Sequence, residues 1–243
     1  MIRKLIFYAL LGVLALGSYY LSVDYLRFKN EHAKTHTNIL VLAPGTIEGT
    51  YKQVLINKIT ELATARPDIT IDIANLKPMN LPFISASRSP LEQETSLPAV
   101  KEWGNRMAHA DALIALVPDV NDGYPAEFKN AIDLLWNELH NKPVGIIVYS
   151  THGVPSNTLI ESLKALFKAV KCDPVTPIIR IDRSSSGKIN DSAYQDDRLK
   201  EINVMIDAVV DKNLHRSYFK QLIRSIGNKI RRRVIRLLNP KKE

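Results

Sequence analysis

ADALIALVPDVNDGYPAEFKNAID, residues 110–133, combines a strand pattern, a polar loop and the start of a helix in one short stretch. Leu113–Val117 is a continuous apolar run of strand length, and the turn-forming residues 118–123 end it. Pro125 stands where a helix tolerates a missing N–H, at its first residue. Ligands of open parallel sheets bind beyond the carboxyl ends of the strands, so this loop is a candidate ligand site. An ordinary strand-to-helix connection is the alternative.

The same alternation of strand and helix patterns extends over the middle of the chain. Apolar runs of strand length also occur at residues 38–43, 69–74, 143–149 and 177–181, and segments with helical spacing separate them. Five strands that alternate with helices predict a parallel sheet covered on both faces. Right-handed crossovers then favour a doubly wound, flavodoxin-like α/β sheet with the strand order 2-1-3-4-5.

Charge is distributed unevenly along the chain. The formal net charge is +8, of which residues 212–243 contribute +10, residues 1–29 contribute +3 and residues 30–211 contribute −5. Because the middle of the chain is acidic, we expect no nucleic acid to bind across it. The length is suited to one globular domain over residues 38–211, preceded by a polar linker at residues 30–37.

Cys172 is the only cysteine of the chain. The chain therefore forms no internal disulfide and no thiolate metal site, and we predict no metal site. A reactive thiol and a partly buried residue at a helix end are both compatible with its neighbours Lys171 and Asp173.

The N-terminal segment is strongly apolar. Leu5–Val23, LIFYALLGVLALGSYYLSV, contains no charged residue, and at 1.5 Å per residue its length just spans the hydrocarbon core of a bilayer. We predict a single-pass transmembrane helix within residues 1–29, and therefore localisation at a membrane. The alternative is a cleaved signal peptide, for which Ala15-Leu16-Gly17 resembles the small-residue cleavage site.

The basic tail, residues 212–243, has an amphipathic pattern. Apolar residues recur every four positions, with lysines and arginines between them, at Leu214, Tyr218, Leu222, Ile226 and Ile230. This pattern predicts a basic amphipathic helix that binds an anionic membrane surface, at about 1 kcal/mol per basic residue, with the domain on the cytoplasmic side. A terminal helix packed on its own domain and a non-specific nucleic-acid arm are the alternatives.

Three loops follow the first, third and fourth predicted strands, at residues 44–50, 118–123 and 150–153. In a sheet of order 2-1-3-4-5 these loops lie at one edge. The first loop, PGTIEGT, leads into a helix N-terminus, where free N–H groups and the helix dipole favour a phosphate. It contains neither a Walker motif nor G-x-G-x-x-G, and a turn that merely starts a helix is the alternative.

These features resemble the NADPH-dependent FMN reductase family. Residues 118–121, PDVN, take the place of the family's P-E-Y-N loop, and residues 129–133, KNAID, reproduce its helix signature. The resemblance covers about residues 37–175. It implies that the phosphate of FMN lies in the first loop and that the isoalloxazine ring lies against the second and third loops. The implied cofactor-binding residues are Gly45, Thr46, Gly49, Thr50, Tyr51, Pro118, Asp119, Val120, Asn121, Ser150, Thr151, His152 and Gly153.

The sequence departs from the family pattern at the phosphate loop. The family's arginine falls on Ile47, and the loss of a charge-assisted hydrogen bond costs about 1.5–3 kcal/mol. Glu48 adds an anion beside it. Lys52 compensates if its ammonium group turns toward the loop. Val120 replaces the family's tyrosine and offers less surface to a flavin.

The resemblance implies a function as an FMN-dependent NAD(P)H oxidoreductase, which the N-terminal segment predicts to be membrane-tethered. Its substrate would be a small electron acceptor such as a quinone or free flavin, and a homodimer is possible. We predict no catalytic side chain, because the flavin carries the hydride and the protein supplies position and hydrogen bonds. His152 would tune the flavin, unless it is an exposed loop histidine. The alternative function is a membrane-bound interaction module whose flavin site is degraded.

Overall fold

The computed structural model describes residues 15, 17–27, 36–45, 50–84, 97–150, 153–182 and 192–238. The chain forms two compact units. The larger unit is His36–Asn213, and the smaller one combines Met1–Thr35 with Leu214–Glu243.

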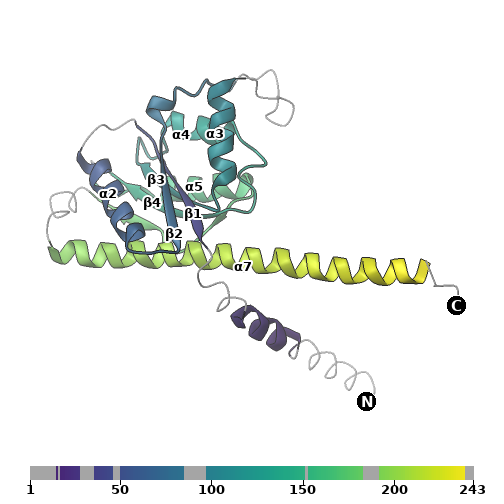
Figure 1. Ribbon diagram of the computed structural model, residues 1–243. Helices are drawn as coiled ribbons and strands as arrows, with labels where there is room; N and C mark the ends of the chain where they lie inside the picture. Colours follow the sequence, from purple (N-terminus) through teal and green to yellow (C-terminus); the bar gives the residue numbers. More distant parts are fainter. Residues whose placement is uncertain are drawn as a thin grey trace, which may run out of the picture. The chain divides into compact units, whose positions relative to one another are not determined.

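The larger unit contains a parallel sheet whose strands alternate with helices (Figure 1). Its elements are β1 Thr37–Ala43, α2 Thr50–Thr64, β2 Ile69–Asn75, the 3-10 helix η1 Lys77–Met79, α3 Pro98–His109, β3 Ala112–Pro118, α4 Ala126–Asp133, β4 Pro143–Tyr149, α5 Asn157–Ala169, β5 Asp173–Pro174, β6 Ile179–Ile181 and α7 Ser192–Leu238. The strand order is β2-β1-β3-β4-β5, and all pairings within the sheet are parallel. The predicted flavodoxin-like order 2-1-3-4-5 is therefore confirmed.

The fifth position of the sheet is divided between two short strands. Both β5 and β6 pair with β4, whereas the sequence predicted one continuous strand at residues 177–181. Pro174 and Pro177 have no backbone N–H to donate to a ladder, so they limit each piece to a few residues.

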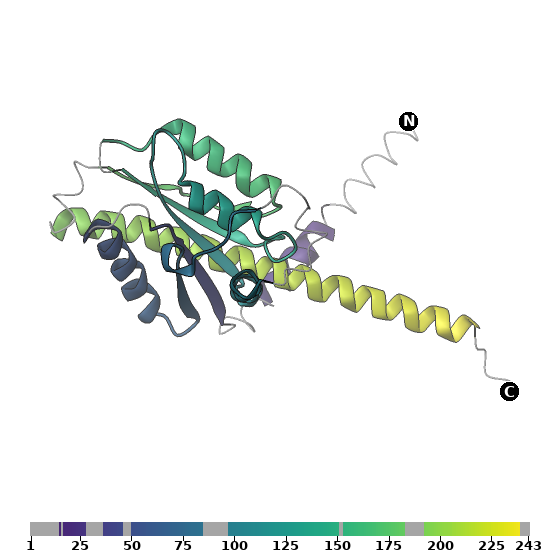
Figure 2. The ribbon, with the colours of Figure 1, turned by 90° about the horizontal axis from the view of Figure 1, so that it is seen from above.

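Helices cover both faces of the sheet, with α4 and α5 on one side and α2 and the first part of α7 on the other (Figure 2). Every residue of β3 and of β4 is buried, as expected of strands covered on both faces. Gly145 of β4 marks the close approach of α7, because a Cβ at this position would lie 2.9 Å from the sulfur of Met205. The two central strands β3 and β4 are thus covered on both faces.

An arginine joins the start of β2 to α7. The Arg66 guanidinium lies 3.2 Å from the carboxylate of Asp68 and 2.5 Å from that of Asp207. Burial alone raises the pKa of Asp68, but the hydrogen bond and the charge of Arg66 outweigh it and lower this pKa below its usual value. The ionised Asp68 therefore stabilises the fold at neutral pH, and this contribution is lost as the pH falls through its lowered pKa.

We expect Arg66→Ala to lower the free energy of unfolding of the full chain by about 1 kcal/mol at neutral pH. The cost should shrink below about pH 4, where the unfolded chain takes up a proton at Asp68, and it should be lost once the pH falls below the lowered pKa of the folded chain. Urea unfolding at several pH values measures both effects. Lys164→Ala, which breaks an exposed pair with Glu161 on α5, is the control and should change stability by a few tenths of a kcal/mol at most. An Arg66→Ala cost that does not depend on pH would contradict this account of Asp68.

The predicted transmembrane helix is wrong, and so is the membrane localisation inferred from it. Among the described residues, no helix is both long enough and apolar enough to cross a membrane. Helix α7 is long enough, but charged side chains recur throughout it. Residues 1–14 and 16 of the predicted anchor lie outside the described part.

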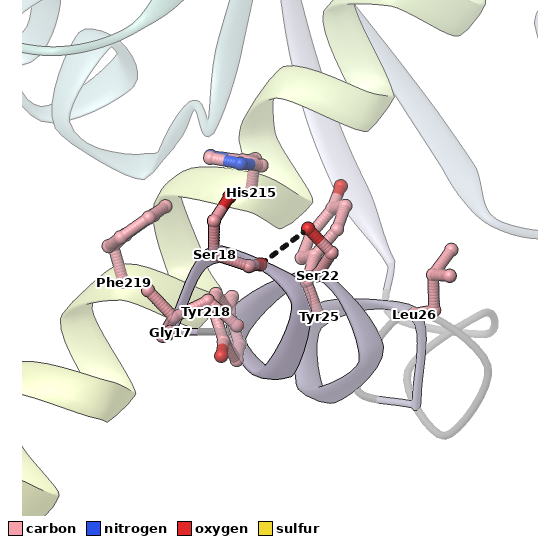
Figure 3. Close-up of a pocket in the computed structure, with 9 residues that line it drawn as sticks. Gly17, Ser18, Ser22, Tyr25, Leu26, His215, Tyr218 and Phe219 are labelled. Carbon is pink, nitrogen blue, oxygen red and sulfur yellow. Dashed lines mark hydrogen bonds between the residues drawn. The ribbon is translucent and has the colours of Figure 1, made fainter. Parts of the chain in front are cut away.

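The smaller unit contains a cavity of about 660 Å³. Residues 17–27 pack here on α7, where the ring of Tyr25 lies 4.7 Å from that of His215 and 5.5 Å from that of Tyr218 (Figure 3). The lining is Gly17, Ser18, Leu21, Ser22, Tyr25, Leu26, His215, Tyr218 and Phe219. Figure 3 also shows the Ser22 hydroxyl, which donates a hydrogen bond to the Ser18 carbonyl at 2.8 Å. None of the predicted cofactor-binding residues lines this cavity.

Candidate functional site

The three predicted ligand loops start from the same edge of the sheet. In the parallel register Leu42 of β1 is level with Ala115 of β3, and Pro118 of β3 is level with Tyr149 of β4. The carboxyl ends of these three neighbouring strands therefore lie side by side, which is where open α/β sheets bind ligands.

Only some of the predicted cofactor-binding residues lie in the part of the chain that the structure describes. Thr46, Gly49, Thr151 and His152 lie outside the described residues, and so do Ile47 and Glu48. Thr50 and Tyr51 are the first two residues of α2, and only the backbone of these two residues is described. The residues that the structure brings to the edge are Gly45, Pro118, Asp119, Val120, Asn121, Ser150 and Gly153.

Gly45 is in close contact with two other segments. Its N–H donates a hydrogen bond to Oε1 of Glu127 on α4, at 2.5 Å. A Cβ at this position would lie only 2.3 Å from Cβ of Lys77 in η1, so a larger residue does not fit. The first loop is thus held close to η1, and its amide faces a negatively charged acceptor.

A buried lysine lies beneath the first loop. Lys52 of α2 donates hydrogen bonds from Nζ to the Pro44 carbonyl at 3.3 Å and to Oδ1 of Asn75 at 3.4 Å. The ammonium group turns toward the start of the loop, which is the condition for it to compensate for the missing arginine. The loop therefore has a positive charge at its base.

The second loop is a tight turn. Val120 and Gly123 exchange backbone hydrogen bonds of 2.9 and 3.0 Å, and the two residues between them have positive φ, 52° for Asn121 and 62° for Asp122. Two successive left-handed residues define a type I′ turn, which asparagine and aspartate tolerate well. Asn121 is exposed at the tip of this turn.

Asp119 joins the second loop to the third. Its carboxylate accepts hydrogen bonds from the N–H of Asp122 at 3.0 Å and from the N–H of Ser156 at 2.7 Å. Its own N–H donates to the Tyr149 carbonyl at 2.7 Å, and the Ser150 N–H donates to the Ile181 carbonyl at 3.0 Å. Asp119 therefore positions the turn against the start of α5, and the amides of Asp119 and Ser150 already have acceptors within the protein.

The KNAID segment of α4 has a structural role in this chain. Lys129 pairs with Asp133 one turn later, at 2.7 Å. The amide group of Asn130 accepts a hydrogen bond from the Ile84 N–H and donates one to the Pro82 carbonyl, each at 3.0 Å. This segment therefore fixes the connection after η1 onto α4, beside the edge of the sheet.

The sequence analysis missed Glu127 as a residue of this edge. Its carboxylate accepts from Gly45, and its charge also reaches the fully buried Tyr149 at the end of β4. Burial, together with the negative charge of Glu127, raises the pKa of Tyr149 above its usual value. An acidic residue in the first turn of the helix after the second loop was the available signal, but helix N-termini favour acidic residues for other reasons.

The family model described as NADPH-dependent FMN reductase matches residues 37–179, more than half of the chain. The chain belongs to the NADPH-dependent FMN reductase family. The predicted family is confirmed, and with it the expectation of FMN and NAD(P)H as the cofactors of the family.

Three relatives show the extent of the similarity. An NAD(P)H-dependent FMN reductase of Schizosaccharomyces pombe is 36% identical over 85 residues, which are 34% of this chain but only 42% of that protein. The flavoenzyme FerB, an NAD(P)H:(acceptor) oxidoreductase from Paracoccus denitrificans, is 19% identical, with a TM-score of 0.57 over 72% of this chain and 98% of its own. An NAD(P)H:quinone oxidoreductase from Methanothermobacter marburgensis is 17% identical, with a TM-score of 0.51 over 74% of this chain and 98% of its own. At these identities the two solved structures support the fold alone.

The described part of this edge contains hydrogen-bond donors that suit the phosphate of FMN. The Gly45 N–H already bonds an anionic oxygen, which is the same kind of acceptor as a phosphate oxygen. Lys52 supplies a nearby positive charge. Gly45 and Lys52 are therefore the described residues of this edge whose donors suit a phosphate.

Proposed function

We propose that this chain is an FMN-dependent NAD(P)H oxidoreductase that reduces a small electron acceptor, such as a quinone or free flavin. When bound, FMN supplies the hydride chemistry. The observation that supports this proposal best is that the loops after β1, β3 and β4 start side by side at the carboxyl ends of these strands, where open α/β sheets bind ligands. Membership of the NADPH-dependent FMN reductase family agrees with it.

Residues of this chain would bind and orient the cofactor. The Gly45 N–H, which belongs to the first loop, and the Lys52 ammonium, which donates to the Pro44 carbonyl of this loop, would hold the phosphate. Asp119 would keep the turn at residues 120–123 in place beside the ring, because its carboxylate joins this turn to the start of α5. A turn that is already ordered lowers the entropic cost of binding the ring.

Titration of the purified full chain with FMN tests the proposal. We expect saturable quenching of flavin fluorescence, and NADPH oxidation in the presence of a soluble quinone that requires both FMN and the protein. Heat-denatured chain is the control for reaction of free flavin. The absence of binding at about 50 μM FMN, a weak affinity for a cofactor, would contradict the enzymatic function.

A flavin-free interaction module is the second candidate function. Two observations favour it: Ile47 stands where the family has an arginine, and Glu127 already occupies the Gly45 amide. Both features would weaken the binding of a phosphate.

Restoring the arginine separates the two functions. We expect Ile47→Arg to tighten FMN binding about ten- to a hundred-fold, because it adds a charge-assisted hydrogen bond to the phosphate. Ile47→Gln, which is polar but uncharged, is the matched control, and fluorescence titration gives both dissociation constants. If the unmodified chain binds no FMN while Ile47→Arg binds it, the flavin-free module is the better description. Equal affinities of all three chains would show that residue 47 does not face the phosphate.

Two further partners stay predictions. They are an anionic membrane surface for the basic tail, residues 212–243, and a second copy of the chain in a homodimer. Co-sedimentation of the full chain with phosphatidylserine vesicles tests the first, and sedimentation velocity tests the second.

A further inference from the structure

Glu127 reaches from one loop of the edge to another. It lies in the first turn of α4, which follows the second loop, and it bonds the amide of Gly45 in the first loop at 2.5 Å. The two residues are 82 positions apart in the sequence, so this contact exists only in the folded sheet. The carboxylate therefore crosses the edge from the loop after β3 to the loop after β1.

The charge of this carboxylate also affects Tyr149 at the end of β4. Tyr149 closes β4 and is completely buried, and the charge of Glu127 helps to raise the pKa of this tyrosine. Glu127 thus places a carboxylate directly at the loop after β1.

A phosphate and this carboxylate would compete for the same donor. The Gly45 N–H has a single hydrogen, and at 2.5 Å Glu127 already takes it. Two anions at one amide would also repel each other strongly at such a short separation. Lys52 beneath the loop attracts either anion.

We propose that Glu127 is a built-in competitor of the flavin phosphate, which occupies the Gly45 amide in the flavin-free protein and leaves it when FMN binds. This inference rests on the proposed function, because the competition requires a chain that binds FMN. It makes Glu127 a residue that sets the affinity of the chain for FMN. Riboflavin, which has no phosphate, does not compete with it.

Glu127→Gln tests the competition with little change in shape. The glutamine keeps an oxygen that accepts from Gly45 but removes the charge. We expect the full-length variant to bind FMN about tenfold more tightly or better, with riboflavin affinity unchanged. Glu102→Gln, the same change at an exposed position on α3, is the matched control and should leave both affinities unchanged.

The amide signal of Gly45 in ¹H–¹⁵N spectra of the full chain reports the contact directly. Without flavin, this signal should shift as Glu127 is titrated with acid, and Glu127→Gln should abolish that titration. Addition of FMN, but not of riboflavin, should move the same signal in the unmodified chain.

The outcomes separate this inference from the proposed function. Equal FMN affinity of the unmodified chain and Glu127→Gln would overturn the competitor role and leave the oxidoreductase intact. A Gly45 signal that does not follow the titration of Glu127 would overturn the contact itself. If no variant binds FMN, the proposed function fails, and the competition fails with it even where the titration shows the contact.

Discussion

Trp103→Ala should lower the free energy of unfolding of the chain by about 3–5 kcal/mol, the cost of removing a large buried aromatic side chain. Trp103 is completely buried between α3 and the sheet. Its indole N–H donates to the Ala131 carbonyl at 2.8 Å. Because α4 ends at Asp133, this carbonyl belongs to the last turn, whose carbonyls lack partners within the helix. The substitution therefore leaves a cavity and an unsatisfied carbonyl together.

Trp103→Phe separates these two contributions. The phenyl ring fills much of the space but donates no hydrogen bond, so we expect a smaller cost of about 1–3 kcal/mol. Urea denaturation followed by circular dichroism measures both variants. A cost below about 1 kcal/mol for Trp103→Ala would show that the α3–α4 contact does not support the core, since buried tryptophans are otherwise worth more.

Gly45→Ala should abolish measurable FMN binding in the full chain. The added Cβ would lie 2.3 Å from Cβ of Lys77, an atom next to the backbone of η1 that cannot rotate away. The first loop must therefore move, and its amide leaves the position where it bonds an anion. We also expect the free energy of unfolding to fall by about 1–3 kcal/mol, as is typical of overpacking.

Gly104→Ala is the matched control for Gly45→Ala. Its Cβ would lie 3.7 Å from the nearest atom, in the middle of α3, where alanine is the better helix former. We expect unchanged FMN affinity and equal or slightly higher stability. Fluorescence titration and urea denaturation apply to both variants. FMN binding by Gly45→Ala at the affinity of the unmodified chain would remove the first loop from the cofactor site.

Much of the fold could be predicted from the sequence, because apolar runs of strand length that end at turn formers, such as residues 113–117, are typical of strands covered on both faces. The alternation of these runs with helical patterns leaves few topologies, and the order 2-1-3-4-5 is among the most common. The family could also be predicted, because its signature lies in one continuous stretch at residues 118–133.

Other predictions failed because they were made from the composition of short segments, whereas the structure of these segments also depends on how the rest of the chain packs around them. The apolar segment at residues 5–23 predicted a membrane span, but among the described residues no helix is long enough and apolar enough to cross a membrane. The fifth strand was predicted as one piece, although prolines on both sides of Val175 interrupt the ladder. The basic tail and the last domain helix were predicted as separate segments, whereas they form the single helix α7.

By itself, the sequence determined the order of strands and helices, the family and the three loops that follow β1, β3 and β4. These features follow from the periodicity and the turn-forming residues of short segments of sequence. They do not depend on contacts with residues far away in the chain. Only the tertiary structure decided that Glu127 takes the Gly45 amide, that Asp119 joins two loops and that Lys77 leaves no room beside Gly45. Such contacts join residues far apart in the chain, and hydrogen-bond geometry arises only after the sheet has brought them together.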